Sequence, residues 1–558
     1  MSKSNFKVLV KYYFFFFLFS AIYQVPYGIT LNTGFVGLRD SVYFTFLWLA
    51  PIILFYKYAK NIAFIIGFIL WLASLLNIGY YLTFSQEFSQ SIIFIVMESN
   101  PSESIEFFEA YVKWWHVLII ILYTYISIVF WKALKPLNKP KNYNQLILPL
   151  VFIITFFGPF LQMYLSDHYS YDKSMHKFKN ILERSSSPWS FIIGYQKYKQ
   201  DLNNINKLLK EHKNIKKLSN LLDKYKDQNS TFILIIGESQ NKSRMSLYGY
   251  ERKTTPNLDA ISDKLIAFNN VYTPRPYTIE ALTQILTFAD QKHPYIYLTQ
   301  QNIITIMKQA GYETYWVTNQ ITQRADNTVI TAFTKMADHQ RYLNNSRRGR
   351  SISYDEKVLQ PLKNILQQKS IKKKFIIVHL FGSHTVFKYR YPDSFNKFKT
   401  KIKNKHLTKS ELESYNTYDN SIYYNDYIIS QIIKLIQSDN NPAALLYFSD
   451  HGQEVYDDDK KHKMSRNEDN PTKAMYTVPY IIYGNNLWKK QTNVTNINLN
   501  KLYSSSDTIY TFLDIAGITF DGFDKTKSIV NKKFKQYSVL IGNPRKHLRD
   551  LTKKPFKN

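Results

Sequence analysis

The sequence predicts an α-helical membrane domain with five transmembrane helices, followed by an α/β domain whose mainly parallel sheet lies between helices. Two observations carry this prediction. Five apolar runs in the N-terminal part of the 558-residue chain are each long enough to cross a bilayer as a helix. After them, short apolar runs alternate with amphipathic stretches, as in a parallel sheet covered by helices. A hydrophobic content of 45%, with 16% aromatic residues, excludes a disordered or fibrous chain.

The five apolar runs also predict an orientation. Lysines stand at the N-terminus, after the second run and after the fourth, whereas the alternate loops contain mostly acids. Because cytoplasmic loops retain Lys and Arg, the N-terminus is expected inside and the chain after about residue 167 outside. A cleaved signal peptide at 1–24 is the alternative, but it lacks a clear small-x-small cleavage site. The runs are 8–24, 42–58, 62–82, 115–131 and 145–165.

The charge balance and the absence of cysteine narrow the function classes. The chain has 72 Lys and Arg against 42 Asp and Glu, a net charge of +30. Export of the C-terminal part argues against nucleic acid, so an anionic membrane or glycolipid surface is the expected partner. A base-composition bias toward Lys accounts for the excess equally well. Without cysteine, disulfides are excluded and any metal must be bound by His, Asp, Glu or hydroxyl groups.

The chain divides into four predicted segments. The transmembrane domain covers 1–167, and a catalytic domain covers 229–545. Between them, 168–228 is rich in Lys and Asn with apolar residues at helical spacing, which predicts an amphipathic helical linker. Residues 546–558 form a basic tail.

Within 229–545, the apolar runs are expected to be strands and the amphipathic stretches helices. The expected strands are TFILIIG (231–237), YETYWVTN (312–319), KKFIIVHLFG (373–382), AALLYFSDHG (443–452) and VPYIIYG (478–484). The expected helices lie near 256–266, 278–288, 300–310, 354–368 and 411–437.

Three of these strands end in potential metal ligands. Ligand sites in such sheets gather at the carboxyl ends of the strands, where the side chains of neighbouring strands meet. Any one of these residues alone is more often a helix cap or a core histidine. Together, Glu, Asp and His without thiolates suit a catalytic zinc or manganese site with an open position. The residues are Glu238 and Ser239, His379 and His384, and Asp450 and His451, with His462 following in the next loop.

Two hydroxyl groups are candidates for a nucleophile at such a metal. Ser239 follows Gly237 and Glu238, but GESQN is not the G-x-S-x-G pattern of a hydrolase. Thr278 begins the helix IEALTQIL after an extended, proline-containing approach, beside free backbone amides and the positive end of the helix dipole. Because threonine also caps helices routinely, the spacing leaves both interpretations of Thr278 open.

Four ordered motifs resemble the bacterial phosphoethanolamine transferases, membrane-anchored members of the sulfatase and alkaline phosphatase superfamily. They are IIGESQNKSRMSLYGYERKTTPNL, TPRPYTIEALTQILTFADQ, HLFGSHTVFKYRYP and FSDHGQE. The resemblance implies an inner-membrane enzyme with an alkaline-phosphatase-like catalytic domain in the periplasm. It further implies transfer of phosphoethanolamine from phosphatidylethanolamine to lipopolysaccharide, an outer-membrane modification, through a phosphorylated threonine at a zinc site.

The resemblance also assigns roles by position. It implies that Thr278 is the nucleophile, and that His384 and His462 are catalytic residues that contact the phosphoryl oxygens, a second zinc ion or the leaving oxygen. The His462 match is imperfect, because the L-H-G-x-P-Y context is absent and the spacing is one residue shorter. One zinc ion is expected to bind tightly, with a second left open. The implied ligands of the first are Glu238, Thr278, Asp450 and His451.

Two further features bear on the substrates. MESNPSESIEF (97–107) resembles the family's loop element, which implies that Ser99 and Glu103 contact the ethanolamine head group. A carboxylate there would pair with the ammonium group. The absence of cysteine departs from the lipid A-modifying members, and PRPYTIEALTQILTFAD resembles those that modify core heptose. A core-heptose acceptor is therefore favoured, while the acceptor position and the oligomeric state stay open.

Two rival functions remain at this point. Another membrane-anchored sulfatase-superfamily enzyme, such as a phosphoglycerol transferase, would have the same domain order and transfer a different group. A non-catalytic membrane scaffold would be expected to lack at least one of Glu238, Thr278, Asp450 and His451, and all four are present.

Overall fold

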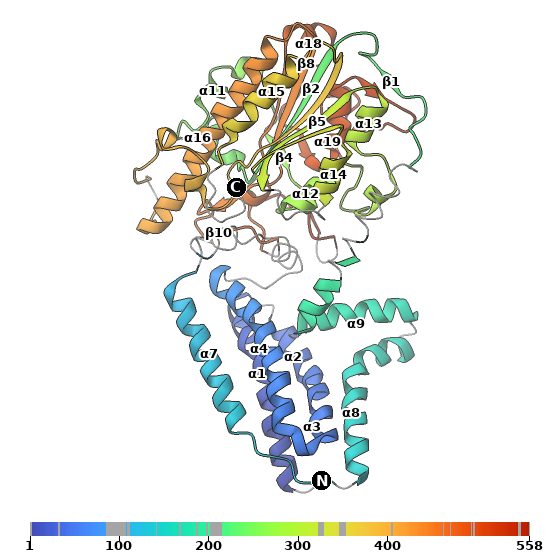
Figure 1. Cartoon of the computed structure of the whole chain (residues 1–558), viewed down its shortest axis with the longest axis vertical. Coiled ribbons are helices and arrows are strands. Elements are labelled where there is room, and N and C mark those ends of the chain that lie inside the picture. The colour runs from blue at the N-terminus through green and yellow to red at the C-terminus, as the bar shows by residue number, and fades with distance from the viewer. Residues whose placement is uncertain are drawn as a thin grey trace. The chain divides into compact units, whose positions relative to one another are not determined.

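The computed structural model describes most of the chain in two compact units, a helical N-terminal unit and a C-terminal unit that holds every described residue from 203 onward (Figure 1). The described residues are 3–31, 34–84, 108, 112–140, 142–166, 169–185, 188–196, 199–200, 203, 215–321, 329–344, 353–402, 405–460, 463–468, 470–492, 494, 497–544 and 548–556.

The N-terminal unit is a bundle of apolar helices. By length and composition, five stretches of its described residues can cross a membrane, as the sequence predicts. They are Lys3–Ile29, Phe35–Leu54, Tyr56–Thr83, Trp114–Lys132 and Asn144–Ser166. The bundle is built from α1 (Lys3–Leu31), α2 (Gly34–Phe44), α3 (Leu49–Leu54), α4 (Ala59–Phe84), α7 (Trp114–Lys132) and α8 (Asn142–Leu161).

The second span begins earlier than the run at 42–58 predicts. It starts at Phe35 and therefore includes Arg39 and Asp40, which the sequence analysis assigned to a loop. The guanidinium of Arg39 lies 2.7 Å from Asp40 Oδ1, and Asp40 is buried. Because the two opposite charges pair with each other, the span can include them. Hydropathy alone does not predict this earlier start of the span.

The predicted linker contains one further helix of the N-terminal unit, α9 (Tyr171–Ser185). Phe178 and Leu182 on its apolar face pack with Phe44 of α2 and Phe156 of α8. The helical spacing of apolar residues that predicted an amphipathic helix lies further on, at 203–225. Residues 204–214 of that stretch lie outside the described residues, and 215–225 form turns and a short strand in place of a helix.

The C-terminal unit is built on a seven-stranded mixed sheet in the order β3-β11-β8-β2-β7-β5-β6. The five strands from β8 to β6 are parallel, with β2 between β7 and β8. The sequence predicts four of these strands but not β6. The strand at VPYIIYG, β11, instead runs antiparallel to β8. The chain leaves β8 and enters β11 at the same end of the two strands, so β11 runs back beside β8 in the opposite direction. The strands are β2 (Ser230–Gly237), β3 (Ile266–Ala267), β5 (Glu313–Ile321), β6 (His339–Asn344), β7 (Lys373–His379), β8 (Ala443–Ser449) and β11 (Tyr480–Gly484).

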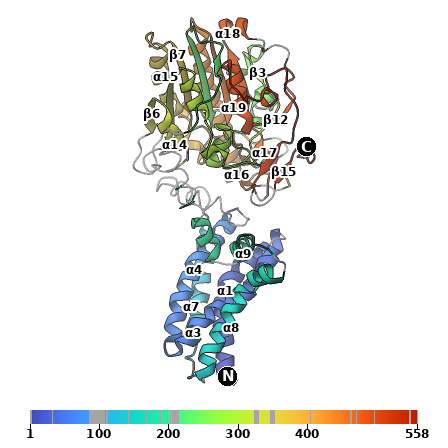
Figure 2. The same cartoon turned by 90° about the vertical axis from the view of Figure 1, so that its right-hand side faces the viewer.

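Helices cover both faces of this sheet (Figure 2). Alternate residues of β2 point to opposite sides: Phe232, Leu234 and Ile236 enter one core, and Ile233 and Ile235 enter the other. The first core includes α12 (Thr278–Ile285), α13 (Ile303–Gln309), α14 (Val329–Met336) and α19 (Thr508–Ile515), and the second includes α15 (Leu359–Leu366) and α16 (Lys409–Gln437). Because both faces are covered, β2 is buried along its whole length and polar chemistry is confined to the strand ends.

Short strand pairs complete the C-terminal unit at both ends of the predicted catalytic domain. β1 (Leu222–Asp223), in the predicted linker, pairs with β13 (Ile518–Thr519). β15 (Leu548–Asp550), in the predicted basic tail, pairs with β14 (Leu540–Gly542). The remaining pairs are β4 (Asn270–Tyr272) with β12 (Leu502–Ser504), and β9 (Glu454–Val455) with β10 (Met464–Ser465).

Candidate metal centre and active site

The first component of the site is the sharp turn that follows β2. Ser239 adopts a left-handed backbone conformation (φ 59°), unusual for a residue with a side chain. Its Oγ donates a hydrogen bond to Glu238 Oε1 at 2.6 Å, and its backbone N–H donates to Asp450 Oδ1 at 3.1 Å. Ser239 therefore orients the two carboxylates, and its hydroxyl is engaged by Glu238.

The second component is the end of β8, where Asp450 and His451 follow the strand. Asp450 Oδ1 accepts the backbone N–H of His451 at 2.7 Å, while its Oδ2 is buried and accepts no hydrogen bond from any described residue. The Nδ1 of His451 lies 2.9 Å from the carbonyl oxygen of Gly452, which fixes the proton on Nδ1. The lone pair of Nε2 consequently faces the carboxylates. A side chain at Gly452 would lie 2.1 Å from the carbonyl oxygen of Ala474, so only glycine permits this turn.

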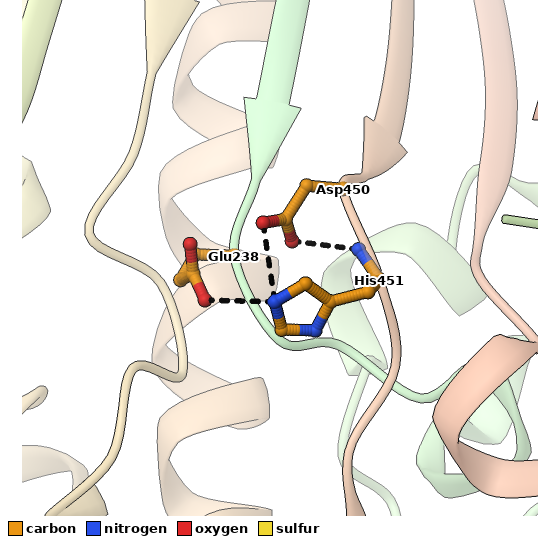
Figure 3. A group of neighbouring side chains, drawn as sticks. All are labelled: Glu238, Asp450 and His451. Carbon is orange, nitrogen blue, oxygen red and sulfur yellow. Dashed lines mark hydrogen bonds and ion pairs between the residues drawn. The ribbon is translucent and has the colours of Figure 1, made fainter. Parts of the chain in front are cut away.

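Glu238, Asp450 and His451 converge on one point (Figure 3). Their ligand atoms lie within 4.8 Å of one another, with His451 Nε2 at 3.5 Å from Glu238 Oε1 and 3.4 Å from Asp450 Oδ2. All three side chains are at least 99% buried. Two adjacent carboxylates and an imidazole lone pair, directed at the same point without solvent, are a donor set that fits a divalent cation such as zinc.

The electrostatics of this cluster reflect the same arrangement. Burial, and then the neighbouring charge of Asp450, raises the pKa of Glu238 to about 7. Burial also raises the pKa of Asp450. Burial, followed by the charge of Arg466, lowers the pKa of His451 to about 4, which keeps its imidazole neutral and able to bind a metal.

Thr278 lies at the edge of this cluster. Its Oγ1 is 3.2 Å from Glu238 Oε2 and 3.3 Å from His451 Nε2, and the residue is half-buried at the first position of α12. The preceding loop is fixed by Thr273, whose hydroxyl donates to the carbonyl oxygen of Asp450 at 2.6 Å. The hydroxyl of Thr278 is thus held between two candidate metal ligands while remaining accessible.

The two histidines of the β7 region differ in position. His379 is inside the domain, with its ring edge-on to Trp316, and burial lowers its pKa to about 3. His384 stacks on Phe381 and interacts electrostatically with Arg466 and His451. Burial, together with these charges and that of Arg390, lowers the pKa of His384 well below its usual range. His384 is therefore a neutral imidazole that interacts with the candidate metal centre through His451.

Three predicted site residues, His462, Ser99 and Glu103, lie outside the described residues.

Two residues of the site were missed by the sequence analysis. Gln320 on β5 donates to the carbonyl oxygen of Leu380 at 2.8 Å and lies 3.5 Å from Glu238 Oε2. The sequence offered a signal for Gln320, because it is a polar residue directly after the predicted strand at 312–319. Arg466, directly after β10, lies 2.9 Å from His451 Nε2 and 3.8 Å from Glu238 Oε1. Nothing in the sequence marks Arg466, because a short hairpin brings it there.

The sulfatase family model matches residues 230–518, the region that contains the sheet and the whole cluster. Phosphoethanolamine transferase EptC of Escherichia coli K12 is 41% identical over 538 residues, which cover 95% of this chain and 93% of the relative. The chain belongs to the sulfatase family. Within that family it is a phosphoethanolamine transferase, and CptA of Salmonella typhimurium is 42% identical over the same length and coverage.

Two solved structures resemble this transferase. The C-terminal periplasmic domain of EptC from Escherichia coli, crystallised in complex with Zn, aligns with a TM-score of 0.59 and 44% identity. It covers 61% of this chain and 98% of that domain. The integral membrane protein EptA of Neisseria meningitidis aligns with a TM-score of 0.67 at 18% identity, over 93% of this chain and 98% of EptA. The second likeness confirms the fold, including the helical N-terminal part.

Proposed function

We propose that this transferase moves phosphoethanolamine from phosphatidylethanolamine to the core heptose of lipopolysaccharide, through a zinc-dependent phosphothreonine intermediate on Thr278. The observation that carries the proposal is the position of the Thr278 hydroxyl, within 3.3 Å of both Glu238 and His451. A hydroxyl held beside a cation site and opening a helix is suited to nucleophilic attack on phosphorus.

The residues present fit zinc. Asp450 Oδ2 is buried without a hydrogen bond from the described residues, and His451 directs a lone pair at the same point. Glu238, Asp450, His451 and Thr278 would hold the ion, and His384 and His462 are proposed to serve the phosphoryl group or a second ion. Zinc bound there would favour ionisation of the nucleophilic hydroxyl and offset negative charge on the phosphoryl oxygens.

The reaction is two successive in-line displacements. In the first, Thr278 Oγ1 forms a bond to phosphorus as the bond to diacylglycerol breaks, and Glu238 Oε2, at 3.2 Å, is the nearest carboxylate to the hydroxyl proton. The ring of His384, which burial keeps neutral, retains an N–H that can donate to a phosphoryl or leaving oxygen. In the second, a heptose hydroxyl attacks the same phosphorus and frees Thr278.

The cellular setting of the proposal follows from the substrates. Donor and acceptor are both lipids, so an inner-membrane enzyme with five spans and a periplasmic catalytic domain would meet both. Ser99 and Glu103 are proposed to hold the ethanolamine group, with the carboxylate facing its ammonium.

Mass spectrometry tests this proposal in two steps. Lipopolysaccharide from cells that lack this chain should lose one phosphoethanolamine on core heptose, which the wild-type chain restores and Thr278→Ala does not. Wild-type protein incubated with phosphatidylethanolamine should gain a phosphoethanolamine adduct on Thr278. An adduct on Ser239 would reject the assignment of the nucleophile, and a glycerol phosphate adduct from phosphatidylglycerol would favour the phosphoglycerol transferase.

A further inference from the structure

The guanidinium of Arg466 is a charged feature of the candidate metal centre that the proposed mechanism leaves unused. Its Nη1 lies 2.9 Å from His451 Nε2 and 3.8 Å from Glu238 Oε1. Because the proton of His451 is on Nδ1, the guanidinium donates to the lone pair that a metal would need. The Arg466 side chain is 23% exposed, whereas the cluster beneath it is buried.

Arg466 is held there by the hairpin that precedes it and by an ion pair that follows it. β10 ends at Ser465 and pairs with β9, which follows the end of β8 after the four residues 450–453. Two residues beyond Arg466, Glu468 accepts hydrogen bonds from Arg275 at 2.8 and 3.1 Å, and both side chains are buried. Arg275 stands three residues before Thr278 on the loop that carries the nucleophile. The same ion pair therefore fixes the segment of Arg466 to the loop of Thr278.

The lone pair of His451 Nε2 cannot serve a guanidinium and a metal ion at once. When a cation binds His451 and Glu238, the guanidinium must leave that contact, and its partial exposure allows it to turn toward the open side. Thr278 Oγ1 lies 3.3 Å from the same nitrogen, so the displaced guanidinium remains beside the atom that receives the phosphoryl group. A guanidinium presents a planar set of donors that matches two phosphoryl oxygens.

We infer that Arg466 is a catalytic residue with two positions. In the metal-free protein it pairs with His451 and Glu238, and in the metal-loaded protein it binds the non-bridging oxygens of the phosphoethanolamine group on Thr278. This inference rests on the proposed function for its second position only. Its first position concerns the metal-free protein and can be tested without any substrate.

The first arm of the test measures zinc binding to the full-length protein in detergent, by competition with a chelator and without donor lipid. Arg466→Met removes the competing cation and keeps a long side chain, so zinc should bind about tenfold more tightly than to wild type. Arg466→Lys keeps a positive charge and should remain nearer to wild type. Arg341→Met, at an exposed position of β6, is the matched control and should not change zinc affinity.

The second arm measures the rate of adduct formation on Thr278 with phosphatidylethanolamine at saturating zinc. Arg466→Met should slow it about 10²-fold to 10³-fold, the usual effect of removing one donor to a developing charge. Arg466→Lys should lie between Arg466→Met and wild type, because a point charge replaces the planar fork.

The outcomes separate this inference from the proposed function. Tighter zinc binding with slower adduct formation in Arg466→Met supports both positions. Unchanged or weaker zinc binding in a folded Arg466→Met protein overturns the first position, and a wild-type adduct rate in that variant overturns the second. If the wild-type protein forms no adduct, the proposed function and the second position both fail, while the zinc measurements still decide the first.

Discussion

Two buried clusters of charged residues lie in the C-terminal unit, and they are built in opposite ways. In one, Arg244 lies between Asp419 and Asp457, at 2.7 and 3.0 Å, and Arg252 donates to the second oxygen of Asp419 at 2.8 Å. In the other, Glu238 and Asp450 lie side by side around His451, and the nearest described cation is the partly exposed Arg466.

The difference between the clusters indicates their roles. In the Arg244 cluster, buried charges of opposite sign satisfy one another, and the ring of Tyr415 packs on the Arg244 guanidinium at 3.4 Å. Such an arrangement stabilises the fold and leaves no unpaired charge in the cluster that could bind a ligand. In the Glu238 cluster, like charges are buried together and Asp450 Oδ2 has no donor among the described residues. Buried like charges persist where a bound cation or a reaction requires them.

The largest expected effect is on activity, in the Glu238 cluster. Asp450→Asn should lower phosphoethanolamine transfer at least about 10³-fold, because a bound metal supplies several kcal/mol of charge stabilisation. Zinc binding, measured on the same protein by chelator competition, should weaken in parallel. Transfer within tenfold of wild type would contradict the assignment of Asp450.

The next effect is on stability, in the Arg244 cluster. Asp419→Asn should lower the free energy of unfolding by about 3–5 kcal/mol, because it leaves the buried Arg244 and the partly buried Arg252 with one counter-charge fewer. Thermal unfolding of the full-length protein measures the loss, and zinc affinity of the remaining folded protein should be unchanged. Asp459→Asn is the control: Asp459 pairs with Lys405 but is 78% exposed, so its loss should change stability by no more than about 0.5 kcal/mol.

A third effect tests the Arg275–Glu468 pair that connects the loop of Thr278 to the segment of Arg466. Arg275→Met should reduce kcat about 10²-fold, since a small displacement of a nucleophile has an effect of this size. The double variant Arg275→Met with Glu468→Leu should recover stability, because both buried charges are removed, but not kcat. Recovery of kcat in the double variant would show that the pair stabilises the fold without positioning Thr278.

The smallest effect is a gain of stability. In the metal-free protein, Glu238→Gln should raise the free energy of unfolding by about 1 kcal/mol, because it removes one of two adjacent buried negative charges. Thermal unfolding with excess chelator measures the change. With zinc present the order should reverse, since the wild-type protein gains binding energy that the variant lacks. A loss of stability in both conditions would place Glu238 with the structural carboxylates.

Much of the site could be predicted from the sequence, because the apolar runs show where the strands end and which polar residues stand there. β2, β7 and β8 are apolar runs. His379 is the last residue of β7, and Glu238 and Asp450 directly follow β2 and β8. Parallel neighbouring strands bring such ends to one edge. The same reasoning also made His379 a candidate metal ligand, but His379 lies at the end of its strand in the domain core, beside Trp316. It also left Ser239 as a candidate nucleophile, and only the structure shows its hydroxyl donating to Glu238.

The sequence by itself determined the order of the domains, the five apolar helices, the parallel centre of the sheet and the residue types of the candidate metal centre. These follow from local patterns of hydropathy and from motifs. The tertiary structure alone decided the antiparallel course of β11, the place of Gln320, and the contact of Arg466 with His451. It also decided the pairing of Arg275 with Glu468, which are 193 residues apart. The reason is physical: local patterns fix which side chains a strand end offers, but chain reversals and long-range ion pairs decide which of them meet.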